Sequence, residues 1–473
     1  MEKTAGELMY KPNKAYVMAI TLVATLGGLL FGYDTAVISG AVGSLREFFI
    51  TPLHLPELEA NTLLGFMISS ALIGCIIGGV TAGVVSQKLG RKKGLIIAAV
   101  LFTLSAIGAS MPEALNFFGV SNLYSFVIYR IVGGIGVGIA SMLSPMYIAE
   151  IAPAHIRGSL VSWNQFAIVF GMLIIYFVNL MISKQGDLAW NTQTGWRYMF
   201  ASGAIPAVLF LILLFFVPES PRWLAMKSKS AKALDILTRI GGIEHAESEM
   251  KEIELSVVEE KGTIFSYGVL IVIIGILLSV FQQFVGINVV LYYAPEIFKN
   301  AGSSTDSSLL QTLLVGFINL VFTVLAIFTV DRFGRKPLQI IGALGMAVAM
   351  FGLGFTFYLQ RLGIGSLVCM LTYTAFFAMS WGPVTWVLLS EIFPNKIRWV
   401  MSIAVAAQWI ANFFVSWTFP MMDKSTFLTN TFHHGFAYWI YGFMGLLAAW
   451  FMIKYVPETK GKSLEEMSKL WKK

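Results

Sequence analysis

The chain has 473 residues, of which 57% are hydrophobic and only 12% are charged, and its mean hydropathy is +0.74. Soluble globular proteins have about 25% charged residues, so this composition excludes a water-soluble chain and indicates a membrane protein. The net charge of +7 does not indicate a nucleic-acid partner, because the basic residues lie in short loops between apolar runs. The two cysteines, Cys75 and Cys369, lie in separate apolar segments and predict neither a disulfide nor a cysteine metal site.

Apolar runs long enough to cross the membrane dominate the chain, since a helix needs about 20 residues to span the hydrocarbon core. The first run begins near Tyr16, is too long for a signal-peptide core and contains Asp34. Lipid offers the backbone no hydrogen-bond partners, so these runs are expected to be helices, and they are too long for barrel strands. The sequence therefore predicts an all-α membrane protein with twelve spans, at about 15–40, 62–86, 94–111, 122–149, 160–183, 197–217, 266–298, 308–330, 337–359, 365–391, 400–421 and 435–456.

Basic residues set the predicted orientation. They fill the connections after the second and eighth runs, around Arg91 and Arg335, which places both connections in the cytoplasm. An even number of crossings then puts both termini inside. The polar segment 219–262 carries both charge signs and is expected to form short amphipathic helices over the inner face. The predicted domains are a six-helix bundle at 1–218, this linker at 219–262, a second six-helix bundle at 263–456 and a cytoplasmic tail at 457–473.

Three motifs recur in the same order in the two halves. KLGRKK at 88–93 matches RFGRKP at 332–337, YIAEIAPAHIRG at 147–158 matches LLSEIFPNKIRW at 388–399, and PESPRW at 218–223 matches PETKGK at 457–462. The nearly constant offset indicates that a six-helix unit has been duplicated.

These repeats, with GGLLFGYDTAVISG at 27–40, FQQFVGINVVLYYAPEIF at 281–298 and SWGPVTWVLLSEIFP at 380–394, resemble the sugar porter family of the major facilitator superfamily. The resemblance covers essentially the whole chain and is nearest to the bacterial D-xylose–proton symporters. It implies two six-helix bundles with a substrate site between them at the membrane midplane. It also implies secondary active transport of a monosaccharide, D-xylose or a glucose-like hexose, by proton symport across the bacterial inner membrane. No cofactor is predicted, and we expect a functional monomer.

Asp34 is the first candidate functional residue, because a carboxylate within a membrane run is costly unless it is paired or neutralised. Arg130, within the fourth run, is its natural partner. Burial favours the neutral acid and a nearby guanidinium favours the carboxylate, so separating the two would make Asp34 take up a proton. A permanent structural ion pair is the alternative.

The resemblance assigns proton coupling to this pair, but it also implies a buried glutamate where this chain has Gly203. A proton-independent facilitator therefore stays open.

Primary amides within the apolar runs form the second candidate set. They offer donors and acceptors that suit the hydroxyls of a neutral sugar, although single buried amides also join helices. The resemblance places sugar contacts at Gln165, Gln282, Gln283, Asn288, Asn319, Trp386 and Gln408. Phe31, Tyr292 and Trp409 could pack against the apolar face of a sugar ring, and a bend at Gly382, before Pro383, could free backbone groups.

The third set lies at the predicted inner face. Ion pairs among Arg91, Glu150 and Arg157, and their repeats Arg335, Glu391 and Arg398, are expected to close the inner gate, the alternative being basic loops that only set topology. Trp399 replaces a glycine of the first repeat in a link one residue shorter, and is expected either to wedge this gate or to anchor the helix at the interface.

An enzyme is not predicted, since no nucleophile–base set and no metal-ligand spacing is found among the five histidines. GGIGVG at 133–138 lies within a membrane run beside Arg130, so it indicates close helix packing rather than a phosphate loop. A membrane sugar sensor remains an alternative, which the short tails disfavour.

Overall fold

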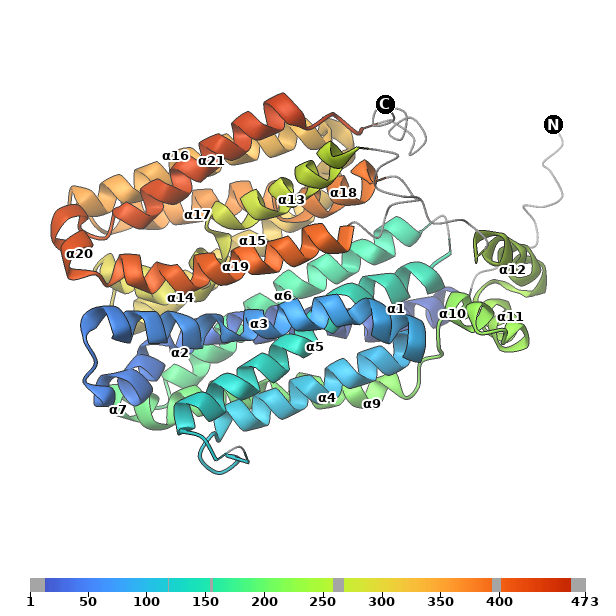
Figure 1. The fold of residues 1–473 in the computed structure, drawn as a ribbon, viewed down its shortest axis with the longest axis horizontal. Helices are drawn as coiled ribbons and strands as arrows, with labels where there is room; N and C mark the ends of the chain where they lie inside the picture. The colour runs from blue at the N-terminus through green and yellow to red at the C-terminus, as the bar shows by residue number, and fades with distance from the viewer. Residues whose placement is uncertain (1–12, 118, 154–155, 258–267, 394–400, 461–473) are drawn as a thin grey trace.

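The computed structural model describes residues 13–117, 119–153, 156–257, 268–393 and 401–460, and regular secondary structure in these ranges is entirely helical (Figure 1). The first half contains α1 (Lys14–Ala36), α2 (Ile38–Leu45), α3 (Glu57–Leu89), α4 (Arg91–Ser110), α5 (Asn122–Ile151), α6 (Arg157–Ser183), α7 (Leu188–Trp190), α8 (Trp196–Ser202) and α9 (Ala204–Leu214). Short π- and 3-10 helices at Arg46–Ile50, Thr51–Leu53 and Asn191–Gly195 complete it.

Three short helices follow, as predicted for the polar segment: α10 (Pro221–Met226), α11 (Ser230–Gly241) and α12 (Ile243–Val257). The second half contains α13 (Val269–Phe284), α14 (Ile287–Asn300), α15 (Thr305–Phe333), α16 (Arg335–Tyr358), α17 (Ile364–Met379), α18 (Pro383–Ile392), α19 (Met401–Asp423), α20 (Thr426–Phe432) and α21 (Phe436–Tyr455). We call the end of the molecule that carries α10–α12 the linker end (Figure 1).

Within the described residues, eleven helical segments are long and apolar enough to cross a membrane, and they correspond to eleven of the twelve predicted runs. The remaining run corresponds to α19, whose polar side chains, including Gln408 and Asn412, lower its hydropathy. Its 23 residues span about 35 Å at 1.5 Å per residue, enough to cross the hydrocarbon core. Since α19 also packs against α3 and α13, it belongs with the other spans.

Two of the spans are broken, and the first break lies beside the predicted amide residues Gln282, Gln283 and Asn288. The first break separates α13 from α14 at Val285 and Gly286, where Gly286 adopts a φ of 93° that favours glycine. The Val285 carbonyl, which loses its helical partner there, accepts a hydrogen bond of 2.8 Å from the Tyr373 hydroxyl. The second break lies between α17 and α18 and includes Gly382, so the predicted bend before Pro383 is confirmed.

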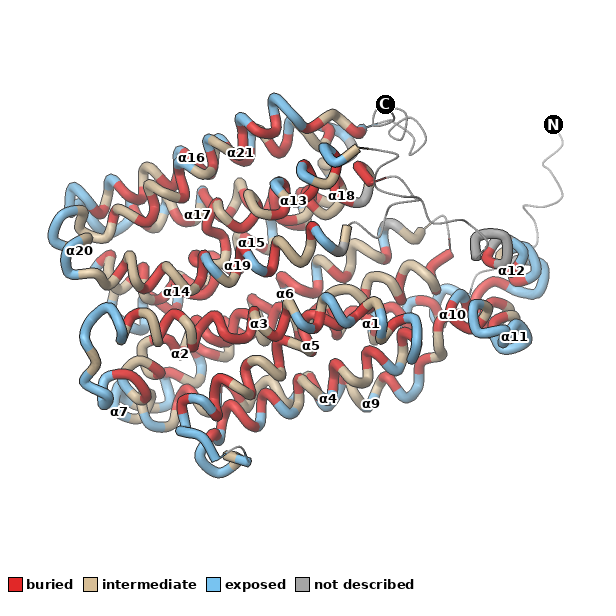
Figure 2. The backbone as a smooth tube through the Cα atoms, viewed as in Figure 1, coloured by how far each residue is buried: buried red, intermediate tan, exposed pale blue. Residues whose placement is uncertain are grey.

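Buried residues follow the helix faces that meet inside each half, whereas α11 and the described part of α12 are exposed along one side (Figure 2). The halves lie against each other at the end opposite the linker and diverge toward the linker end (Figure 1). Hydrogen bonds between the halves join Thr426 N to Glu57 Oε1 (2.5 Å), Trp417 Nε1 to the Thr62 carbonyl (3.1 Å) and the Tyr176 hydroxyl to the Leu291 carbonyl (2.8 Å).

Candidate transport site

Asp34 on α1 and Arg130 on α5 form the predicted ion pair. Arg130 Nη1 lies 3.1 Å from Asp34 Oδ1 and 3.2 Å from Oδ2, and both terminal nitrogens lie 3.3 Å from the main-chain oxygen of Asp34. The guanidinium also lies over the Phe200 ring, 5.4 Å from its centroid. Arg130 is almost fully buried, with 1% of its side chain exposed, so the carboxylate is its principal compensating charge.

The glycines of GGIGVG bring α5 close to its neighbours, as the sequence indicates. A side chain at Gly134 would collide with the Ala71 carbonyl of α3, and one at Gly138 would lie 2.5 Å from the Cys75 carbonyl. At Gly133 it would meet Ser105 of α4 and approach Asp34 Oδ1. Close packing around Arg130 therefore depends on glycine, which identifies this segment as structural.

The amides at the first helix break form a continuous hydrogen-bonded chain. Gln282 Nε2 donates to the Trp381 carbonyl at 2.8 Å, which links the α13 break to the α17–α18 break. Gln283 Nε2 donates to Gln282 Oε1 at 3.3 Å, and Asn288 Nδ2 donates to Gln283 Oε1. The two glutamines are buried. This arrangement fixes the side chains in place before any ligand binds.

Other predicted sugar contacts lie on different helices. Trp409 of α19 lies against Phe31 of α1, with ring centroids 5.6 Å apart, so this contact joins the two halves. The polar atoms Gln408 Oε1 and Trp409 Nε1 are buried and have no hydrogen-bond partner among the described residues. Tyr292 is buried on α14 and interacts with Asn412. Gln408 Oε1 and Trp409 Nε1 are suited to bind a polar ligand, because a buried polar atom without a hydrogen bond destabilises the protein.

Gln165, Asn319 and Trp386 lie on α6, α15 and α18. No hydrogen bond joins them to the amide chain within the described ranges. Their roles, like those of the whole predicted sugar-binding set, stay predictions.

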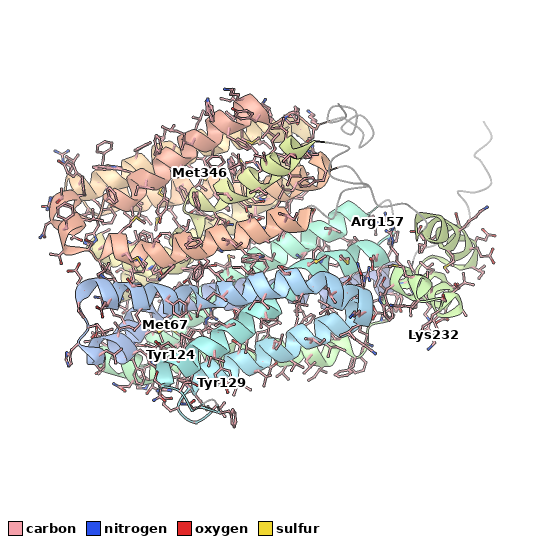
Figure 3. All side chains as sticks on the ribbon, in the orientation of Figure 1. Met67, Tyr124, Tyr129, Arg157, Lys232 and Met346 are labelled. Carbon is pink, nitrogen blue, oxygen red and sulfur yellow. The ribbon has the colours of Figure 1, made fainter. Side chains whose placement is uncertain are left out.

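The predicted gate ion pairs lie within each half rather than between the halves. Arg91 Nη2 binds Glu150 Oε1 at 2.7 Å, and Arg335 Nη2 binds Glu391 Oε1 at 2.8 Å. Arg157, labelled in Figure 3, begins α6 and pairs with Glu249 of α12 at 3.5 Å. Arg398 and Trp399 lie outside the described residues. The gating role of this set stays a prediction.

A second carboxylate lies beside each of the two arginines Arg91 and Arg335, and it was not predicted from the sequence. Glu219 Oε1 accepts hydrogen bonds from the Arg91 and Lys92 main-chain nitrogens, at 2.9 and 3.1 Å. The Glu458 carboxylate likewise accepts hydrogen bonds from the main-chain nitrogens of Arg335 and Lys336. A carboxylate at a helix N-terminus is stabilised by the helix dipole and the free N–H groups. In the sequence, these carboxylates are marked by the repeated Pro-Glu pair before Ser220 and Thr459, which indicates duplication but does not show which residues the glutamates contact.

Taken together, two pseudo-symmetric helical halves, a buried acid–arginine pair and an amide chain at broken helices define a polytopic membrane transporter. The chain matches the sugar (and other) transporter family model over residues 20–471, and it belongs to that family. The predicted family and the all-helical membrane fold are therefore confirmed, as is the expectation that the protein is a transporter and not an enzyme.

The chain is 62% identical to the D-xylose-proton symporter of Escherichia coli K12, an alignment that covers 97% of this chain and 96% of that protein. It is 40% identical to the glucose facilitated diffusion protein of Zymomonas mobilis, over 97% and 98% of the two chains. The inward-open structure of the E. coli xylose transporter XylE superposes with a TM-score of 0.86 at 59% identity, covering 96% and 100% of the chains. XylE bound to 6-bromo-6-deoxy-D-glucose gives 0.82 at 61% identity, over 97% and 100%.

Proposed function

We propose that this protein carries D-xylose together with a proton across the bacterial inner membrane, with both termini in the cytoplasm. The observation that carries the proposal is the buried Asp34–Arg130 pair in a chain 62% identical to a D-xylose-proton symporter. A carboxylate that loses its arginine partner inside a membrane must become neutral, and taking up a proton achieves this. A conformational cycle that alters this pair therefore couples to a proton gradient.

The proposed sugar site is the amide chain with the aromatic residues around it. Gln282, Gln283 and Asn288 present donors and acceptors at the first helix break. Gln408 and Trp409 add a buried acceptor and a buried donor that lack partners among the described residues. Hydroxyl groups of a neutral sugar can satisfy both atoms, whereas a charged substrate would require a buried countercharge. Gln165, Asn319, Trp386, Phe31, Tyr292 and Gly382 complete the proposed site.

We infer that the two six-helix halves, 1–218 and 263–456, rock about this site, with 219–262 as the cytoplasmic linker and 457–473 as the tail. The hydrogen bonds Glu57–Thr426 and Thr62–Trp417 support closure of the end opposite the linker. Divergence of the halves at the linker end, and the TM-score of 0.86 to inward-open XylE, support an inward-facing conformation. The ion pairs Arg91–Glu150 and Arg335–Glu391 would then brace each half as the inner gate opens and closes. We expect the monomer to be the functional unit.

A proton-independent facilitator is the second candidate. Gly203 in place of an acid, and 40% identity to a glucose facilitated diffusion protein, favour it. Uptake into proteoliposomes with and without an imposed pH gradient separates the two. Symport predicts that D-xylose accumulates above its external concentration only with the interior alkaline. Equilibration without accumulation in both conditions would establish the facilitator, and a panel of D-xylose, D-glucose and L-arabinose would rank the substrates.

A further inference from the structure

A small cavity lies directly beside the proposed coupling acid. Its volume is about 10 Å³, and Tyr33, Asp34, Phe102, Ala106, Phe200 and Gly203 are among the residues that line it. Roughly this volume is needed to hold one buried water molecule. The Asp34 side chain is 13% exposed, whereas the Arg130 side chain is only 1% exposed. The acid is therefore accessible while its partner is sealed.

Gly203 is the residue that keeps this cavity open. A Cβ atom built at this position would lie 3.3 Å from the Phe200 carbonyl oxygen, 3.6 Å from Ala106 Cβ and 3.6 Å from Tyr33 Cε1. All three neighbours also line the cavity, so a side chain at 203 points into it. The two 3.6 Å separations are ordinary van der Waals contacts, and the Phe200 carbonyl would have to shift by a few tenths of an ångström, so a methyl group fits into this space with a small local adjustment.

The protein groups around Asp34 do not supply a proton of their own. The Tyr33 hydroxyl bonds to Ser202 Oγ at 2.8 Å, and Ser202 Oγ in turn donates to the Met199 carbonyl at 2.6 Å. The Tyr33 proton is thus directed away from Asp34. Cys75 of α3 and Tyr292 of α14 are close enough to interact electrostatically with Asp34, and neither forms a hydrogen bond to it within the described residues.

We propose that the cavity between Asp34 and Gly203 holds one water molecule that exchanges the coupling proton with Asp34. In the loading step, an O–H bond of a hydronium ion at this position breaks and an O–H bond forms on a carboxylate oxygen of Asp34, which leaves neutral water. Release is the reverse step. The hydronium comes from the aqueous phase, so no other reactant is needed. This inference rests on the proposed symport, and it assigns Gly203 the role of a positioning residue that keeps a place for water.

Two substitutions of similar size at Gly203 test whether a water molecule in the cavity transfers the proton. Gly203→Ala fills the cavity with an inert methyl group, whereas Gly203→Ser adds a hydroxyl that can itself accept and donate a proton. Gly83→Ala is the matched control, because a side chain at Gly83 of α3 has no neighbour within 4 Å. Proteoliposome uptake of D-xylose driven by a pH gradient, and D-xylose affinity by calorimetry, are measured for each variant.

The proposal predicts that Gly203→Ala slows gradient-driven uptake by about tenfold, that Gly203→Ser restores most of the rate, and that affinities stay within about twofold of wild type. An alanine variant as fast as wild type would overturn it. Equal slowing by alanine and serine would also overturn it, because packing alone would then account for the effect. Wild-type protein that fails to accumulate sugar under the gradient would instead refute the proposed symport.

Discussion

Arg130 holds Asp34 by both its side chain and its main chain: one terminal nitrogen lies 3.1 Å from Oδ1, and both lie 3.3 Å from the carbonyl oxygen of the same residue. Neutralising the carboxylate therefore removes only part of the attachment, and the guanidinium keeps acceptors on α1. This geometry allows the pair to weaken and reform during a transport cycle without leaving the arginine wholly unsatisfied.

Asp34→Asn is expected to abolish sugar accumulation driven by a pH gradient while D-xylose binding persists. The amide keeps the shape of the side chain but cannot take up or release the coupling proton. Asp306→Asn, an identical change at an exposed residue of α15, serves as the control. Accumulation in proteoliposomes and calorimetric binding are the measurements. An Asp34→Asn protein that still concentrates sugar would show that another group carries the proton.

Gln283→Ala is expected to weaken D-xylose binding by about 1–3 kcal/mol, the cost of leaving a buried polar partner unsatisfied. The loss also removes the acceptor for Asn288 and the donor to Gln282, so the amide chain is interrupted at its centre. Calorimetry of D-xylose and D-glucose binding measures the effect, with the exposed Gln185→Ala as control. Unchanged affinity for both sugars would exclude this cluster from the binding site.

Glu150→Gln is expected to lower the melting temperature in detergent markedly, because Arg91 would lose its charged partner at a buried position. Breaking a buried pair by removing one partner costs about 3–5 kcal/mol. Asp235→Asn removes one partner of an exposed pair with Arg239 on α11, and it should change the melting temperature little. Similar shifts for the two variants would contradict the bracing role assigned to Arg91–Glu150.

The Glu113–Arg197 pair should make stability depend on acid pH. Hydrogen bonds from Arg197 lower the pKa of Glu113, in the connection between α4 and α5, from its usual value of 4.5. A lowered folded-state pKa stabilises the protein above 4.5, and this contribution is lost as the pH falls through the folded value. Melting curves between pH 3 and 7 should therefore show a smaller acid-induced loss for Glu113→Gln than for wild type. Parallel curves would contradict this.

The fold could be predicted because its sequence features are long and occur more than once in the chain. Apolar runs located the spans, and the repeated motifs around Arg91 and Arg335 revealed the two halves. The run at 400–421 was predicted from its pattern, although polar residues such as Gln408 weaken the hydropathy of α19. The Asp34–Arg130 pairing was also predictable, since both charges lie in apolar runs and a buried charge needs a partner.

Details set by three-dimensional contacts could not be read from the chain. Glu219 reaches the start of α4 from a position 128 residues away, so only the fold shows that it binds Arg91. The pairing of Gln282 with the Trp381 carbonyl likewise depends on two helix breaks meeting. Glycine at position 203 is visible in the sequence, but the cavity beside Asp34 depends on the packing of Phe102, Ala106 and Phe200.

Sugar-driven proton movement tests the central claim, coupling of sugar to proton, most directly. D-xylose is added to proteoliposomes that contain a pH-sensitive dye, with equal pH on both sides and the membrane potential clamped by potassium and valinomycin. Symport predicts that the interior acidifies as the sugar enters, and that Asp34→Asn abolishes the change. Sugar entry without any change of internal pH in the wild-type protein would contradict symport.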